Sequence, residues 1–308
     1  MPEPKTSTNK FLIIVSGPTG VGKSSIAMYL AKVYNAEIFS ADSRQIYQEM
    51  NIGTAKPSSK DLESIKHHFI GEKSIFEKYS VGHFENEVNL RLGFYFSSHN
   101  IAIMAGGTGL YLKAVMEGLD QFPEVDSDIL DDLELMYKSH GLDTLKSELK
   151  NSDPEYYEFC DHFNHRRIMR ALSVIRASGK KYSSFLAQKT IVARDYSILP
   201  IYLEVPRDYL YHNINQRVDD MIGAGLMDEA KSLHKYRGVP ALETVGYQEL
   251  FDYFENKIEY QVAVDQIKQN SRRYAKRQMT WFRKHGEWDT FHPEKLIEIR
   301  SFIDNIIG

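Results

Sequence analysis

The 308-residue sequence has a single cysteine, Cys160, so a disulfide within the chain and a cysteine-based zinc finger are both excluded. It has no apolar run long enough to span a membrane, and its polar start, MPEPKTSTNK, lacks the apolar region of a signal peptide. The net charge of −4 gives no global attraction to nucleic acids, so any such binding must come from local patches. We therefore expect a cytoplasmic protein without a membrane anchor, with a disordered tail at residues 1–10 and an inert, packed thiol at Cys160.

Short apolar segments recur along the chain and alternate with helical patterns, which predicts an α/β fold with a parallel sheet flanked by helices. The predicted strands are residues 11–16, 36–42, 100–107 and 197–205. Three of them end in polar or glycine-rich turns, which should converge at the carboxyl edge of the sheet.

The middle of the chain, residues 120–196, has no convincing core strand and reads as a mainly helical insertion domain. Seven acidic residues between Asp120 and Leu135 and six basic residues between Cys160 and Ser183 predict one acidic and one basic face. The catalytic core would then comprise residues 11–119 and 197–308, with a C-terminal part that is helical to the end of the chain.

The segment GPTGVGKSS follows the first predicted strand and fits the P-loop pattern G-x-x-x-x-G-K-[ST]. Glycines let backbone N–H groups surround an anion, the following helix adds its partial positive charge, and the lysine supplies a full one. The hydroxyl of the final serine can hold Mg²⁺. The predicted phosphate-binding residues are Gly17, Pro18, Thr19, Gly20, Val21, Gly22, Lys23 and Ser24.

Asp42 ends the second predicted strand, and the residue types around it leave its role open. NTPases usually have a strand that ends in a metal-binding aspartate, whereas the third predicted strand here ends in Gly106, Gly107 and Thr108. Asp42 could therefore bind the metal shell, cap a helix, or act as a general base facing the ligand of the loop. Nucleoside kinases also have a carboxylate at this position, so position alone does not identify the substrate.

Six separated segments, in order, resemble the tRNA dimethylallyltransferases of bacterial type, which have a P-loop NTPase-like fold. The segments are DSRQIYQEMNIGTAKPS (42–58), AGGTGLYLKAVMEGL (105–119), HRRIMRALSVIRASGK (165–180), RDYLYHNINQRVDDMIGAGLMDEAKSL (207–233), ETVGYQEL (243–250) and RRYAKRQMTWFRK (272–284). The resemblance implies that the P-loop binds the diphosphate of dimethylallyl diphosphate rather than ATP. It also implies that the five-carbon group is transferred to N6 of the adenosine immediately 3′ of the tRNA anticodon.

The same resemblance implies roles for individual residues. Asp42 would accept the proton of the adenine amine, Thr108 would lie beside the reacting groups, and Arg217 would reach the diphosphate with Mg²⁺ as cofactor. A monomer without an obligate protein partner is expected. The residues expected to contact the anticodon stem-loop are Asp42, Ser43, Arg44, Gln45, Arg166, Arg167, Ile168, Met169, Arg170, Gly246 and Tyr247.

The segment 266–285 contains seven Lys or Arg and no acid, interleaved with Tyr274, Trp281 and Phe282. This mixture is typical of surfaces that meet phosphates and bases, although core packing is favoured for Trp281 and Phe282. Relatives often have an RNA-contacting arginine where this chain has Leu130, so that contact is not expected here. We interpret His67, His68 and His83 as structural residues rather than metal ligands.

Three alternatives share some of these features. An adenylate isopentenyltransferase would modify a free nucleotide and would not need the insertion or the basic segments. A nucleoside or nucleotide kinase would use the loop with ATP, and a non-catalytic RNA-binding module would need neither Lys23 nor Asp42. A prenyl-transfer assay that compares an anticodon stem-loop with free AMP as acceptor distinguishes these alternatives.

Overall fold

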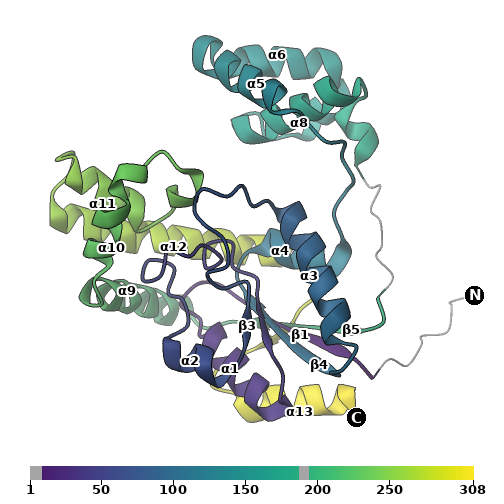
Figure 1. The fold of residues 1–308 in the computed structure, drawn as a ribbon, viewed down its shortest axis with the longest axis vertical. Coiled ribbons are helices and arrows are strands. Elements are labelled where there is room, and N and C mark those ends of the chain that lie inside the picture. Colours follow the sequence, from purple (N-terminus) through teal and green to yellow (C-terminus); the bar gives the residue numbers. More distant parts are fainter. Residues whose placement is uncertain (1–8, 187–193) are drawn as a thin grey trace, which may run out of the picture. The chain divides into compact units, whose positions relative to one another are not determined.

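The computed structural model describes residues 9–186 and 194–308, and its core is a six-stranded, fully parallel sheet (Figure 1). The strand order is β3-β2-β4-β1-β5-β6, so the P-loop strand β1 lies between β4 and β5. The strands are β1 (Phe11–Ser16), β2 (Ile38–Ser40), β3 (His67–His68), β4 (Ile101–Gly106), β5 (Ser197–Leu203) and β6 (Asp289–Phe291).

Both faces of the sheet are buried, because alternate residues of β1 enter two different apolar clusters. Leu12 and Ile14 pack on the side covered by α3 (Val81–Tyr95) and α4 (Gly109–Glu117). Ile13 and Val15 pack on the side covered by α1 (Lys23–Tyr34) and α13 (Leu296–Ile307). This layering explains the continuous apolar run of β1. Because helices cover both faces, a ligand site is expected at the carboxyl edge of the sheet.

Of the remaining helices of the core, one follows β2 in the sequence and four follow β5. The long helix α12 carries the basic segment identified in the sequence. These helices are α2 (Ser59–Ser64), α9 (Arg207–Gly223), α10 (Leu226–Leu233), α11 (Tyr247–Phe254) and α12 (Tyr260–Lys284).

The four strands predicted from the sequence correspond to β1, β2, β4 and β5. The expectation that the chain is helical after the fourth strand is wrong, because Asp289–Phe291 adds β6 beside the end of β5. The two-residue strand β3 was also not predicted. Both are short edge strands that pair with only one neighbour, so neither produces a recognisable apolar run.

The chain divides into two compact units, Met1–Met116 with Ala193–Gly308, and Glu117–Val192. The second unit, which we call the insertion, lies close to the predicted range 120–196 and contains α5 (Ser127–His140), α6 (Leu142–Ser152), α7 (Pro154–Phe159) and α8 (His165–Ser178). Its own small apolar cluster includes Leu133, Leu145, Leu149 and Leu172. The insertion therefore has a core that is separate from the two clusters of the sheet.

Within the described ranges, no helix combines the length and the apolar character that crossing a lipid bilayer requires. Residues 1–8 of the expected tail lie outside the described residues.

Candidate active site

The P-loop connects β1 to α1 at the carboxyl edge of the sheet, and its glycines are required by close contacts. Gly17 and Gly20 have φ of 146° and 82°, which side-chain-bearing residues rarely adopt. A Cβ at Gly17 would lie 2.8 Å from the carbonyl oxygen of Leu203, and one at Gly20 would lie 2.8 Å from Ile214. The loop is thus pressed against β5 and α9, with the N-terminus of α1 beside it.

Two cations converge at this loop, Lys23 from α1 and Arg217 from α9. The Lys23 ammonium donates a hydrogen bond of 2.8 Å to the carbonyl of Pro18, whereas the guanidinium of Arg217 makes no hydrogen bond or salt bridge with any described residue. Burial, and then the charge of Arg217, lowers the pKa of Lys23 to about 7, with Asp42 opposing the shift. Burial also lowers the pKa of Arg217. A bound anion would favour the charged form of both groups.

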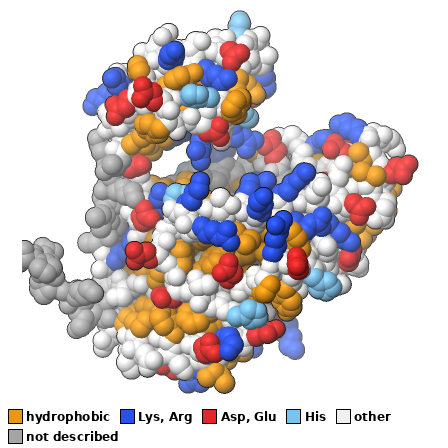
Figure 2. Space-filling view, turned by 180° about the vertical axis from the view of Figure 1, so that it is seen from behind, with side chains coloured by type: hydrophobic (Ala, Val, Ile, Leu, Met, Phe, Trp, Pro, Cys, Tyr) orange, Lys and Arg blue, Asp and Glu red, His pale blue; other side chains and the backbone are white. Residues whose placement is uncertain are grey.

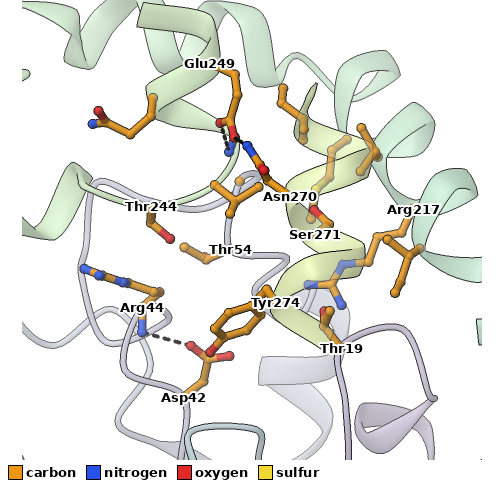
Figure 3. A pocket seen from close by; sticks show the side chains of 18 of the residues that line it. Thr19, Asp42, Arg44, Thr54, Arg217, Thr244, Glu249, Asn270, Ser271 and Tyr274 are labelled. Carbon is orange, nitrogen blue, oxygen red and sulfur yellow. Dashed lines mark hydrogen bonds between the residues drawn. The ribbon is translucent and has the colours of Figure 1, made fainter. Parts of the chain in front are cut away.

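Asp42 lies just after β2 and holds the turn that follows it. Its Oδ1 accepts the backbone N–H of Arg44 at 2.9 Å and of Gln45 at 3.4 Å. Within the described residues Oδ2 has no hydrogen-bond partner, and Figure 3 shows the carboxylate facing the ring of Tyr274. The helix-capping role considered for Asp42 is wrong, because a turn and not a helix follows it. One carboxylate oxygen holds this turn, which leaves the other for a ligand.

Thr108 fixes this turn from the end of β4. Its hydroxyl accepts the N–H of Ser43 at 3.0 Å, and its own N–H donates to the carbonyl of Ala41 at 3.2 Å. The hydroxyl of Tyr274 lies near the side chain of Thr108. The structure thus brings Asp42, Ser43 and Thr108 together, as the sequence predicted for adjacent strand ends.

Two adjoining cavities meet at these residues. The smaller, about 350 Å³, is lined by Gly20, Lys23 and Ser24 of the P-loop, and we call it the donor cavity. The larger, about 740 Å³, lies between the segment 42–54 and the residues 243–249, and we call it the acceptor cavity (Figure 3). The residues that line both are Thr19, Asp42, Arg217 and Tyr274.

Glu229 supports the wall of the acceptor cavity, and sequence reasoning missed it. Its carboxylate accepts three consecutive backbone N–H groups, those of Asn51, Ile52 and Gly53, at 2.8 to 2.9 Å. It also accepts a hydrogen bond of 2.7 Å from the hydroxyl of Tyr247. Nothing in the local sequence separates this glutamate from its acidic neighbours, because its partners lie about 180 residues away in the chain.

The expected contact of Tyr247 with the stem-loop is wrong for its side chain. Its ring is fully buried, and a Cβ at Gly53 would lie 2.6 Å from it. The ring thus supports the loop held by Glu229. The preceding Gly246 lines the acceptor cavity and donates its N–H to buried Glu249 at 2.8 Å.

The polar residues after Asp42 have structural partners of their own. The guanidinium of Arg44 donates to the carbonyl of Ala241 at 2.9 Å, and the amide of Gln45 donates to the carbonyls of Thr54 and Ala55. Both residues therefore hold the loops around the cavities in place, and Arg44 also lines the acceptor cavity.

Gln278 connects the P-loop to the end of β4 and was not predicted as a site residue. Its Oε1 accepts the N–H of Thr19 at 2.8 Å, and its Nε2 donates to the carbonyl of Gly107 at 2.9 Å. The Thr19 N–H is therefore already satisfied by the protein. The available signal was an uncharged amide within a strongly basic helix, which indicates a buried polar contact.

In the insertion, Arg166, Arg167 and Arg170 lie exposed on α8. The expected RNA contact at Ile168 is wrong for the side chain, which is fully buried, and Met169 packs against the same apolar cluster. These two apolar side chains anchor the helix that carries the arginines.

Helix α12 presents an apolar side to the core and a basic side to solvent. Phe282 is buried, as predicted, and Trp281 packs so closely on Gly109 that a Cβ there would lie 2.3 Å away. Figure 2 shows Lys and Arg side chains gathered on one face of the core. The exposed cations of α12 are Arg273, Lys276, Arg277, Arg283 and Lys284.

The residues at the P-loop offer the kinds of ligand that Mg²⁺ prefers. In the part of the chain that the structure describes, no group of three or more His, Cys, Asp or Glu side chains could enclose a metal. Mg²⁺ usually takes one or two protein ligands, with waters and substrate phosphates completing its shell. Ser24 and Asp42 both line the donor cavity and offer such ligands. His68 stacks on Phe39, and its Nε2 lies 2.6 Å from a carboxylate oxygen of Glu37. His83 accepts the backbone N–H of Ser80 at the start of α3.

The fold and site define a P-loop protein whose phosphate loop adjoins a second, larger cavity across an aspartate. Residues 45–285 match the model of the IPP transferase family, and the chain belongs to that family. It is 46% identical over 302 residues to a tRNA dimethylallyltransferase of Christiangramia forsetii, covering 97% of this chain and 99% of the relative. It is 44% identical to one of Flavobacterium psychrophilum, covering 94% and 97%.

Solved structures agree with these relatives. A tRNA isopentenylpyrophosphate transferase of Bacillus halodurans is 35% identical, with a TM-score of 0.69 and coverage of 97% of each chain. A eukaryotic dimethylallyltransferase described as acting on tRNA is 27% identical, with a TM-score of 0.75 over 88% of this chain and 69% of the other.

Proposed function

We propose that this protein is a cytoplasmic tRNA dimethylallyltransferase. It transfers a dimethylallyl group from dimethylallyl diphosphate to N6 of the adenosine 3′ of the anticodon and releases diphosphate. The observation that carries the proposal is the convergence of Lys23 and Arg217 on the P-loop, opposite Asp42 and next to a second cavity. Near-full-length similarity to proteins of that name supports it.

In the reaction, the adenine amine bonds to C1 of the dimethylallyl group while the bond from C1 to the diphosphate oxygen breaks. Asp42 accepts the proton that the amine loses, through the carboxylate oxygen that the Arg44 turn leaves unoccupied. Lys23, Arg217 and the N–H groups at the start of α1 stabilise the negative charge that develops on the diphosphate. Thr108 holds the Asp42 turn in register with the end of β4.

Ser24, with Asp42 through its water shell, would hold Mg²⁺ against the diphosphate. The ion supplies additional neutralisation of the leaving group when it is bound. The proposed donor cavity is large enough for a diphosphate and a five-carbon chain, and the acceptor cavity is large enough for a nucleoside.

For the RNA, the exposed cations of α12 and of α8 would contact phosphates, and the adenosine would leave its stack to reach Asp42. Extruding the base costs a few kcal/mol, which contacts to the flanking nucleotides must offset. The exposed Arg167 and Arg170, with Arg273 and Arg277 on the core, are the side chains proposed for this.

The test is prenyl transfer from labelled dimethylallyl diphosphate with Mg²⁺, comparing an anticodon stem-loop RNA with AMP. The expected result is label on the adenosine 3′ of the anticodon and none on AMP. Label on AMP would instead identify an adenylate isopentenyltransferase, and ATP turnover without transfer would identify a kinase. Chemical mapping of the labelled nucleotide confirms the position of the prenyl group.

A further inference from the structure

Tyr274 occupies a special position between the donor and acceptor cavities. Of the four residues that line both, it is the one with a large ring, and among the described residues neither lining contains another aromatic side chain. Figure 3 shows the ring between Asp42 below and the upper part of the acceptor cavity, where Asn270 and Glu249 lie. The reacting carbon must lie between the diphosphate and the amine, and therefore next to this ring.

The ring is held from several sides. Its hydroxyl lies near the side chain of Thr108, and the guanidinium carbon of Arg277 lies 5.7 Å from the ring centroid. One helical turn further along α12, Gln278 binds the N–H of Thr19 and the carbonyl of Gly107. Tyr274 thus lies on the same helix segment that fixes the P-loop through Gln278, which positions its backbone beside both cavities.

The chemistry at this point is vulnerable to water. As the bond from C1 to oxygen breaks, positive charge develops on the allylic group, and any nucleophile nearby can capture it. The two cavities together have room for many water molecules, each of which needs about 30 Å³. Excluding water from such a site prevents hydrolysis of the reactive species.

We propose that the side chain of Tyr274 is a barrier between the two cavities, which keeps water from the allylic carbon and directs its transfer to the adenine amine. This inference rests on the proposed function and adds a residue that controls the outcome of the reaction. Without the barrier, a water oxygen would bond to C1 while the diphosphate oxygen leaves. The water would lose a proton to solvent, and the products would be dimethylallyl alcohol and diphosphate.

The experiment measures two products from labelled dimethylallyl diphosphate in the presence of Mg²⁺ and the stem-loop RNA: prenylated RNA and dimethylallyl alcohol. Tyr274→Ala removes the barrier, whereas Tyr274→Leu and Tyr274→Phe keep a bulky apolar side chain without the hydroxyl. Alanine is tolerated on a helix, and 38% of the Tyr274 surface is exposed, so the variant should fold. Tyr274→Ser is a second small variant. Gln269→Ala is the surface control, because Gln269 is exposed on the same helix and lines neither cavity.

The expected result is a ratio of alcohol to prenylated RNA at least tenfold higher for Tyr274→Ala and Tyr274→Ser than for the wild type. The ratio of Tyr274→Leu and Tyr274→Phe should stay within about threefold of the wild type. A general loss of structure would lower both products together and leave the ratio unchanged, so the ratio separates a barrier from a structural role.

Two results overturn the inference alone, with the proposed function intact. One is slower transfer in Tyr274→Ala with an unchanged product ratio, and the other is a ratio in Tyr274→Phe as high as in Tyr274→Ala, which would assign the effect to the hydroxyl. If the wild-type protein prenylates no RNA, the proposed function fails and this inference with it.

Discussion

The donor and acceptor cavities are built in different ways, although they share Thr19, Asp42, Arg217 and Tyr274. One continuous segment, Thr19 to Ser24, supplies a lysine, a serine and two glycines to the lining of the donor cavity, and residues from other elements complete it. The wall of the acceptor cavity is held by contacts between distant parts of the chain, such as Glu229 with the amides of Asn51 to Gly53. In the proposed assignment, the diphosphate binds to a local backbone motif, whereas the nucleoside binds in a pocket assembled from distant parts of the chain.

The largest expected effect is that of Asp42→Asn, because Asp42 lines both cavities and is the proposed proton acceptor. The asparagine oxygen can still accept the N–H of Arg44, so the turn should persist, but the side chain no longer accepts a proton. Transfer under single-turnover conditions should slow by about 10²- to 10⁴-fold. Unchanged transfer would show that Asp42 acts only at the turn.

The donor side is tested by Arg217→Gln. Arg217 lines both cavities, but its charge acts on Lys23 of the P-loop, and its guanidinium has no hydrogen-bond or salt-bridge partner among the described residues. We expect the KM for dimethylallyl diphosphate to rise by about ten- to a hundredfold, with the KM for the RNA nearly unchanged. Arg207→Gln, at the start of the same helix and outside both cavities, is the matched control. A larger effect on the KM for the RNA than on that for the donor would contradict the division of the site.

The pH dependence of diphosphate binding tests the donor side through Lys23. The folded-state pKa of Lys23 is lowered from its ordinary value of 10.5 to about 7, so below pH 7 the free protein carries the charge and above it the charge is lost. A bound diphosphate raises this pKa, so binding above pH 7 takes up a proton at Lys23 and should weaken by up to about tenfold per pH unit. Calorimetry in buffers of different ionisation enthalpy measures the proton uptake.

Lys23→Arg provides the control for this prediction, because a guanidinium does not titrate in that range. The variant should retain only the pH dependence that comes from the ionisation of the ligand. An identical pH profile for the wild type and Lys23→Arg would show that Lys23 stays charged throughout.

The smallest effect is expected from Glu229→Gln on the acceptor side. An amide accepts fewer hydrogen bonds than a carboxylate, so the loop at 51–53 should loosen and the free energy of unfolding should fall by about 2 kcal/mol. Affinity for the RNA should fall by several fold. Asp228→Asn, the exposed neighbour on α10, is the control, and chemical denaturation with RNA titration is the measurement.

The same contrast explains what the sequence could predict. The P-loop, the strands β1, β2, β4 and β5, and the adjacency of Asp42 and Thr108 follow from local patterns and from the rule for the carboxyl edge of parallel sheets. Glu229, Gln278 and the burial of Tyr247 depend on partners that are far away in the chain. Tyr247 was misjudged because an aromatic residue beside a glycine fits both a stacking surface and a buried support.

The division into a donor and an acceptor side is tested most directly by two binding titrations on three proteins. Inorganic diphosphate and the stem-loop RNA are each titrated into the wild type, Arg217→Gln and Glu229→Gln. The account predicts a crossed pattern, in which Arg217→Gln loses affinity for diphosphate and keeps it for RNA, and Glu229→Gln does the reverse. If each substitution weakens both ligands to the same extent, the two cavities do not serve separate substrates.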